Sequence, residues 1–351
     1  LNIRIIEIGG KYMKKNITFS DIAKYTNFSK TTISRYFNSP ETLTQASIQK
    51  IEKALSELNY TENKVARSLA NGKTEIIGII IPNLFLHYYS QILNNIIDTY
   101  SKYNYKFLVF LGNSDPNEEI KYIQELMAYK IEGLIILSHS ISSHQLKEFN
   151  IPIVAIERED NYISSVNSDN YSGAEKASKL LIKNKCDILI HINGKINDNT
   201  PAYKRIEAFK ETCERNNQAF KIYMSDIKSS FEESYNSLYQ IYLDIDKNYP
   251  YVKKGVFLSN DTHANIFLNI LIRNKKSIPD EYELIGFDNS PISTEAIIPI
   301  TTISQNIDKI SDYTIKSLLR QINLKKNNKI APIEHIVVPT ELIVRDTTSK
   351  Y

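Results

Sequence analysis

The chain of 351 residues contains no tryptophan, two cysteines and only ten glycines. Cys186 and Cys213 lack the spacing of a metal-binding or redox motif, so we expect ordinary thiols in a reducing compartment. No apolar run approaches the roughly 18 residues that cross a membrane, and the run at residues 76–82 is far too short. No N-terminal segment shows the order of charged, apolar and small residues typical of a secretory signal. We therefore expect a cytoplasmic chain.

Catalytic signatures are missing as well. The sequence has no GxGxxG, GxxxxGK[ST], GxSxG or HExxH motif. Its six histidines are scattered, and His139 and His144 do not have the spacing of two ligands on one helical face. We therefore expect a protein that is not an enzyme, without a cofactor or a metal site.

The balance of charge differs along the chain. Residues 1–75 carry twelve Lys or Arg and seven Asp or Glu, a net charge of +5, whereas the remainder carries 31 and 33, a net charge of −2. A basic N-terminal unit on a near-neutral body favours a nucleic-acid partner for that unit. A random fluctuation in charge would give the same totals, so charge alone does not decide between the two interpretations.

The first twelve residues are expected to lie ahead of the translation start. Gly9 and Gly10 precede Met13, and codons for two glycines can form a purine-rich ribosome-binding site at the right distance from a start codon. We therefore expect translation to begin at Met13 and residues 1–12 to be a non-native extension.

Three short helices are expected between residues 18 and 58. Thr18 and Asp21 have the spacing of a variant capping box, and Asn27 tolerates the left-handed conformation that ends a helix. Ser29 is the expected N-cap of the second helix and Thr44 that of the third. Two short helices joined by a few residues, with a third packed across them, describe a helix-turn-helix unit.

The expected second helix is polar on most of its surface. Ile33, Tyr36 and Phe37 share one face because they are three and four residues apart. In a helix-turn-helix unit the second helix enters the DNA major groove, where Lys30 and Arg35 could donate to guanine or to phosphate. A three-helix bundle with a solvated polar face is the alternative.

Three segments resemble the N-terminal module of lactose-repressor/galactose-repressor (LacI/GalR) family regulators: TFSDIAKYTNFSKTTISRYFN, LTQASIQKIEKALSELNY and NKVARSLANGKT. The resemblance implies that Lys30 and Thr31 read bases and that Arg35 contacts the groove. It places four residues where phosphate contacts or helix supports are expected, namely Thr32, Ser34, Asn38 and Ser47. With Ser29 at the start of the helix, these are the candidate DNA-binding residues of this unit.

The segment NKVARSLANG resembles the hinge helix of the same family. About two turns are too short to be stable alone in water, and in the family the segment folds when two copies meet in the minor groove. The resemblance places Leu69 at the leucine that wedges between central base pairs, and Asn63 and Arg67 at positions that contact groove and backbone. A linker with helical tendency is the alternative.

From residue 76 onward short apolar runs alternate with helical patterns. Runs such as IIGIIIP, EGLIILS and KGVFLS read as buried strands, and SGAEKASKLLIKN and FEESYNSLYQIYLDI as helices. Strands that alternate with helices imply parallel sheets with helices on both faces. About 275 residues are many for one such sheet, so we expect two lobes, with a ligand outside the carboxyl ends of the strands.

This region resembles the periplasmic-binding-protein-like core of the LacI/GalR family, in segments such as VNSDNYSGAEKA, VFLSNDTHA and LIGFDNS. The fold class expected is therefore α/β, a two-lobed core with doubly wound parallel sheets, preceded by an all-α helix-turn-helix domain. The resemblance implies that a small effector lies between the lobes and is bound by Arg205, Asn260 and Asp288. Asp169 and Phe85 are further candidates. A carboxylate that accepts from hydroxyls, beside Arg and Asn donors, suits a polyhydroxylated ligand.

The expected domains are residues 13–61 for the helix-turn-helix, 62–73 for the hinge and linker, and 74–351 for the effector-binding and dimerisation core. We expect the first lobe at about 74–182 and 305–333, and the second at about 183–302 and 334–351. The whole predicts a homodimeric transcription repressor that binds pseudo-palindromic double-stranded operator DNA and a sugar-like effector. A solute-binding protein of a sugar transport system is the alternative, because the core fold is shared.

Overall fold

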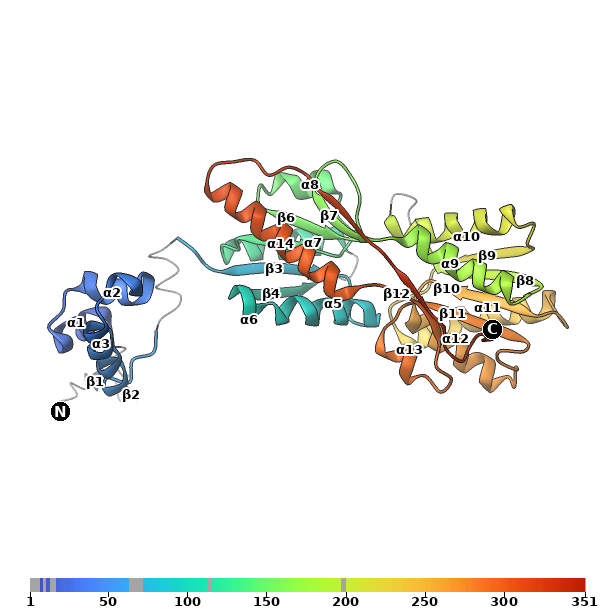
Figure 1. The fold of residues 1–351 in the computed structure, drawn as a ribbon, viewed down its shortest axis with the longest axis horizontal. Coiled ribbons are helices and arrows are strands. Elements are labelled where there is room, and N and C mark those ends of the chain that lie inside the picture. Colours follow the sequence, from blue (N-terminus) through green and yellow to red (C-terminus); the bar gives the residue numbers. More distant parts are fainter. Residues whose placement is uncertain are drawn as a thin grey trace. The chain divides into compact units, whose positions relative to one another are not determined.

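The computed structural model describes residues 7–8, 11–12, 17–62, 72–112, 115–196 and 200–350 of the chain. It divides into two compact units, Leu1–Lys73 and Thr74–Tyr351 (Figure 1). No helix within these described ranges is long and apolar enough to cross a bilayer.

The first unit is built from α1 (Phe19–Thr26), α2 (Lys30–Asn38), η1 (Pro40–Thr42) and α3 (Gln45–Glu57), and it also holds the antiparallel pair β1 (Glu7–Ile8) and β2 (Lys11–Tyr12). The predicted helix starts are confirmed. The Asp21 carboxylate accepts from the backbone N–H of Thr18 at 2.9 Å, and the Ser29 hydroxyl accepts from the N–H of Thr32 at 3.0 Å. Asn27 ends α1 in the left-handed conformation with φ of 55°.

A small apolar core holds these three helices together. Ile22, Ile33 and Ile51 are fully buried, one from each helix. Phe37 stacks on Phe19 with ring centroids 5.0 Å apart, so the aromatic end of α2 is fixed against α1. The polar face of α2 therefore does not contribute to this core.

The first lobe of the second unit contains a six-stranded parallel sheet in the order β13-β7-β6-β5-β3-β4. The strands are β3 (Ile76–Ile81), β4 (Lys106–Leu111), β5 (Gly133–Ile136), β6 (Ile153–Ile156), β7 (Ser164–Ser168) and β13 (His335–Val338). Helices α5 (His87–Asp98) and α14 (Ile307–Lys326) pack on one face, and α7 (Pro116–Ala128) and α8 (Ser143–Glu148) on the other. The short α6 (Tyr100–Tyr103) follows α5.

The second lobe contains a six-stranded sheet in the order β14-β12-β11-β10-β8-β9, in which only the pairing of β14 with β12 is antiparallel. The strands are β8 (Ile188–Gly194), β9 (Phe220–Ser225), β10 (Lys254–Leu258), β11 (Tyr282–Asp288), β12 (Thr301–Ser304) and β14 (Glu341–Ile343). The helices are α9 (Asn170–Lys183), η2 (Pro201–Tyr203), α10 (Lys204–Arg215), α11 (Phe231–Asn248), α12 (Asp261–Arg273) and α13 (Pro291–Glu295).

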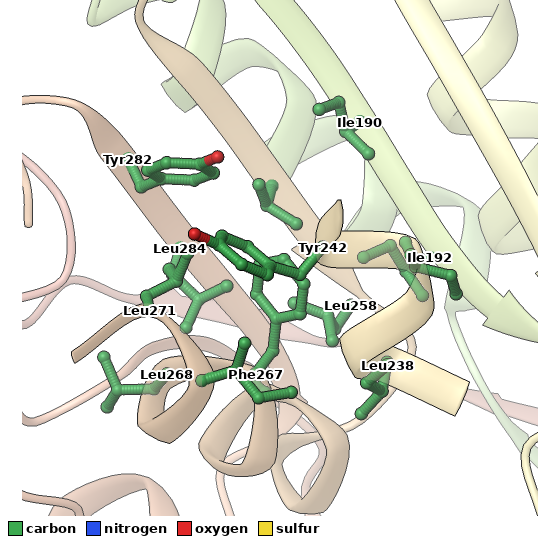
Figure 2. Close-up of a cluster of buried hydrophobic side chains, with 14 of the residues drawn as sticks. Ile190, Ile192, Leu238, Tyr242, Leu258, Phe267, Leu268, Leu271, Tyr282 and Leu284 are labelled. Carbon is green, nitrogen blue, oxygen red and sulfur yellow. The ribbon is translucent and has the colours of Figure 1, made fainter. Parts of the chain in front are cut away.

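The core of the second lobe shows why successive strand residues must alternate between two apolar faces. Ile190, Ile192 and Leu258 pack against α11 and α12, where Leu238 and Phe267 meet them (Figure 2). The intervening strand residues face α9 and α10 on the other side of the sheet. Both faces are covered, which is the expected arrangement of a parallel sheet and confirms the predicted fold class.

Two lobe boundaries differ from those expected. The helix α9 packs on α10 and on the second sheet, so the chain enters the second lobe after β7 rather than near residue 182. The strand β13 pairs in parallel with β7, so residues 335–338 belong to the first sheet. The chain passes between the lobes after β7, after β12 and after β13, and the C-terminal segment ends in the second lobe (Figure 1).

Candidate functional site

The exposed side of α2 is one candidate site. Lys30, Thr31, Arg35 and Asn38 are exposed on this helix. Thr31, Arg35 and Asn38 lie on the side of the helix away from the fully buried Ile33, and Lys30 lies in its first turn. The arrangement offers two cations and short polar groups on one helical surface, as direct readout of DNA requires.

Four of the candidate DNA-binding hydroxyls already have structural partners. The Ser29 and Thr32 hydroxyls lie 2.9 Å apart at the start of α2, where Ser29 caps the helix. The Ser47 hydroxyl lies 2.9 Å from that of Thr44, which caps α3. The hydroxyl of Ser34 accepts from the amide of Asn38 at 3.2 Å. The hinge candidates Asn63, Arg67 and Leu69 lie outside the described residues.

A second candidate site is a cavity of about 270 Å³ in the core unit. Residues at the carboxyl ends of strands from both sheets line it, as the strand topology predicts. From the first lobe come Glu157 after β6 and Tyr88 and Tyr89 in the first turn of α5. From the second lobe come Asn193 in β8 and Ser259 after β10. The cavity also contains three of the five predicted effector residues, Arg205, Asn260 and Asp288.

Arg205 is the buried cation of the cavity. Its Nε donates to the Asn170 side-chain oxygen at 2.6 Å, and its Nη1 donates to the Ser259 carbonyl at 2.5 Å. The guanidinium lies over the Phe287 ring at 3.6 Å from the centroid. Asn170 begins α9, just after the chain has passed from the first lobe to the second. Arg205 therefore links this crossing to the end of β10.

Asp288 is the buried acid opposite this arginine. Burial raises its pKa well above the usual range, with Asp261 and Glu157 adding to the effect and Arg205 opposing it. Its carboxylate accepts from the Gln305 amide at 2.7 Å, and Gln305 in turn accepts from the hydroxyl of Ser168. The backbone of Asp288 has φ of 117°, a conformation that residues with a side chain seldom adopt. Such strain at a cavity wall is typical of functional sites.

Asn260 orients a histidine that the sequence did not single out. The Asn260 side-chain oxygen accepts from the N–H of His263 at 2.8 Å, so its amide nitrogen is the group that lies 3.0 Å from His263 Nδ1. An amide nitrogen donates, so Nδ1 accepts and the proton of the neutral ring lies on Nε2. Burial lowers the pKa of His263 to about 4, which keeps the ring neutral near pH 7.

Two polar atoms beside the cavity are buried without a hydrogen-bond partner. They are Nε2 of His263 and the hydroxyl of Tyr88. Leaving a polar group buried and unpaired costs about 1–3 kcal/mol, so such groups in a native protein call for an explanation. The sequence signal that could have found them is position, since Tyr88 lies in the first turn of a helix at a strand end and His263 lies in the first turn of α12.

Phe85 and Asp169 do not line the cavity. The Asp169 carboxylate accepts from the N–H of Ser172 at 3.0 Å and so caps α9. Phe85 packs at the edge of the apolar core of the second lobe, while its neighbour Leu86 lines the cavity. Their assignment to the effector stays a prediction that the geometry does not favour.

Asp261 lies behind the cavity and gives a testable pH dependence. Burial raises its pKa to about 7, although hydrogen bonds from Thr302 and Ser290 oppose the shift. A carboxyl with a raised pKa in the folded chain stabilises most at low pH, and its contribution falls as the pH rises towards 7. The free energy of unfolding of the parent, relative to Asp261→Asn, should therefore rise by about 2 kcal/mol between pH 8 and pH 5. Urea unfolding at both pH values measures it, and a constant difference would contradict the shift.

The fold and the cavity define a protein with a two-lobed core of the ligand-binding class and a small helical unit of the helix-turn-helix class. Residues 179–348 match the periplasmic binding protein-like domain, and residues 18–63 match the bacterial regulatory proteins of the lacI family.

Full-length relatives show the same combination. The sucrose operon repressor of Streptococcus mutans is 30% identical over 305 residues, covering 87% of this chain and 92% of the relative. The ribose operon repressor of Halalkalibacterium halodurans is 29% identical over 335 residues, covering 94% of this chain and 97% of the relative.

Solved structures agree on the fold. A lac repressor dimer bound to operator and an anti-inducer superposes with a TM-score of 0.80 at 22% identity, covering 95% of this chain and 99% of that one. A regulator from Alkaliphilus metalliredigens, complexed with D-xylulofuranose, superposes with a TM-score of 0.64 at 26% identity, covering 79% and 100%. The chain belongs to the lacI family of bacterial transcription regulators.

Proposed function

We propose that the chain is a repressor whose binding to operator DNA is controlled by a sugar-like effector in the cavity between its lobes. The observation that carries this proposal is the convergence of Arg205, Asn260 and Asp288 on one buried polar cavity in a chain of this family. A buried carboxylate can accept from hydroxyl groups, while arginine and amide groups donate to oxygens. Tyr88 and Tyr89 would cover an apolar face of a sugar ring.

The names of the relatives support a carbohydrate ligand. Repressors of ribose and sucrose operons are similar to this chain over nearly their whole length. The D-xylulofuranose complex has a core of the same fold. The cavity chemistry and these relatives point to the same class of compound.

On DNA, the exposed cations and hydroxyls of α2 would read the two halves of a pseudo-palindromic operator from a homodimer. Leu69 would wedge between base pairs at the centre, with Asn63 and Arg67 on groove and backbone. An effector that closes the cleft between the lobes would change the relative position of the first lobes. It would thereby favour or disfavour the pairing of the two hinge segments. Coupling of this kind is reciprocal, so operator DNA must change the affinity for the effector by the same factor.

Two other functions fit less well. A solute-binding protein of a sugar transporter shares the core fold. Residues 18–63, however, match the bacterial regulatory proteins of the lacI family, and a solute-binding protein has no use for such a domain. A sugar-converting enzyme would need a catalytic constellation, and the relatives are repressors. We infer that the protein works in the cytoplasm, where the operator DNA proposed as its partner is found.

We expect the full chain to bind DNA that flanks its own gene and to change its affinity when a sugar is added. Phosphate contacts should make binding fall steeply with salt, by about 0.9 in log–log slope for each contact. Fluorescence anisotropy with a labelled duplex, titrated at several salt concentrations with and without a panel of sugars, measures both effects. Sugar binding without specific DNA binding would favour the solute-binding alternative.

A further inference from the structure

We propose that the cavity selects an uncharged polyhydroxyl effector and rejects phosphorylated or carboxylated forms of the same compound. This inference rests on the proposed function, because it concerns the ligand of the same cavity. It draws on four features of the described wall: two helix starts whose N–H groups have acceptors in the protein, the partners of Arg205, the buried acids, and the neutral donors.

The start of α5 faces the cavity but offers little to an anion. A helix N-terminus binds phosphate through backbone N–H groups that lack other partners. Here the N–H groups of Phe85 and Leu86 donate to the Asn83 side-chain oxygen at 3.0 and 3.3 Å. The N–H of His87 donates to the Thr262 hydroxyl at 3.3 Å. Side chains of the protein therefore already accept from three of the N–H groups at this helix start.

The start of α12 is capped in the same way. Asn260 accepts from the N–H of His263 through its side chain and from that of Ala264 through its carbonyl. The acid Asp261 follows directly in the first turn. The N-terminal, positive end of this helix dipole therefore already has an acidic side chain of the chain beside it.

The buried cation of the described wall has partners in the protein, and the exposed cation lies near an acid. Two of the three guanidinium nitrogens of Arg205 donate to protein oxygens, which leaves Nη2 for a ligand rather than a two-pronged fork. Lys195 is exposed at the rim. It lies close enough to Asp226 to join Lys228, the stronger influence, in lowering the pKa of that carboxylate. Arg205, the buried cation, therefore keeps one guanidinium nitrogen for a ligand, and Lys195 shares the rim with the acid Asp226.

Two buried acids, Glu157 and Asp288, also form part of the wall. Glu157 accepts from the N–H of Ser168 at 2.7 Å and from the Asn170 amide at 2.8 Å, so it is held in place by its partners. Asp288 is nearly fully buried beside it, and the raised pKa described above shows that additional negative charge is disfavoured there. A phosphate would meet the same burial and the same acids, whereas a hydroxyl could hydrogen-bond to either carboxyl group without adding charge.

The two buried atoms without partners at the cavity belong to uncharged side chains. The tautomer derived above leaves the Nε2 proton of His263 unpaired, and the Tyr88 hydroxyl is unpaired as well. Burial also lowers the pKa of the lining residue His139 to about 4, with Arg158 contributing, so this ring adds no positive charge near pH 7. Neutral donors of this kind match hydroxyl and ring oxygens, and they do not compensate an ionic charge.

The test compares matched pairs of compounds on the full chain by isothermal titration calorimetry. The pairs are D-ribose with D-ribose 5-phosphate, sucrose with sucrose 6-phosphate, and D-glucose with D-glucose 6-phosphate and D-gluconate. We expect the tightest binder to be an uncharged member, and its charged counterpart to bind at least about tenfold more weakly, which corresponds to about 1.4 kcal/mol. Tighter binding of a phosphorylated or carboxylated member would overturn the inference while leaving the proposed function intact. If no member binds, the proposed function fails and the inference fails with it.

A pair of variants tests the donor directly. His263→Phe keeps a ring but removes the N–H, and we expect it to weaken the tightest uncharged binder at least about tenfold. His263→Gln keeps an N–H donor and should recover part of that loss. His144→Phe, at an exposed histidine on α8, is the matched control and should bind as the parent does. Equal losses in the Phe and Gln variants would show a packing role and would overturn the donor assignment.

Discussion

Replacement of Arg205 by alanine should abolish the response of operator binding to the sugar effector. The side chain supplies the buried cation of the cavity, stacks on Phe287 and links Asn170 to the Ser259 carbonyl. Its loss removes a ligand donor and leaves two buried oxygens unpaired, so we expect the affinity for the effector to fall more than about 100-fold. Calorimetry with the tightest uncharged sugar, and anisotropy of operator DNA with and without that sugar, measure the two effects.

The controls for this variant lie on the same helix. Arg215→Ala removes an arginine from the exposed side of α10 and should respond to the sugar as the parent does. Arg205→Lys keeps the charge but not the planar stacking or the paired donors, so it should recover only part of the response. An Arg205→Ala chain that folds and still responds fully would remove this residue from the site.

The sequence predicted helix starts better than it predicted strand partners. A cap depends on residues three positions apart, so Ser29 and Thr44 could be recognised locally, and both cap helices as expected. The partner of β13 is β7, about 170 residues earlier, and no local pattern encodes that pairing. For this reason the expected boundary at residue 334 placed β13 in the wrong lobe.

The polar strand β7 could not be predicted from apolar runs, for a related reason. The strand β7, with the sequence SSVNS, is buried along its whole length although it is mostly polar. Its polar groups find partners far away in sequence, such as the Ser165 hydroxyl, which lies 2.9 Å from Nδ1 of His335. Apolar periodicity cannot reveal a strand whose burial depends on such contacts.

The candidate effector site was predicted in part. Arg205, Asn260 and Asp288 follow motifs at strand ends or on the first turns of helices, and they share one cavity. Asp169 has the same local setting but caps a helix, because an Asp at a strand-to-helix junction can serve either purpose. The unpaired atoms of Tyr88 and His263 could not be read from the sequence, because an unpaired buried atom is a property of the assembled wall.

Replacement of both Lys30 and Arg35 by alanine should weaken specific operator binding more than any single change in the core. Both side chains project from the exposed side of α2, while Ile33 and Phe37 hold the helix from behind. Neither cation contributes to that core, so the unit should stay folded. A good base contact is worth about 1–3 kcal/mol, and a homodimer repeats each contact in two half-sites, so we expect a loss of more than about 100-fold.

Salt and sequence dependence separate the two possible roles of these cations. If Lys30 and Arg35 read bases, binding to a scrambled duplex should weaken much less than binding to the operator, and specificity should be lost. If they only grip phosphate, both duplexes should weaken alike and the salt slope should fall by about 0.9 for each lost contact. Lys53→Ala removes an exposed cation from α3 and is the matched control. Anisotropy with both duplexes at three salt concentrations decides the matter, and unchanged operator affinity in the double variant would mean that α2 is not the helix that reads DNA.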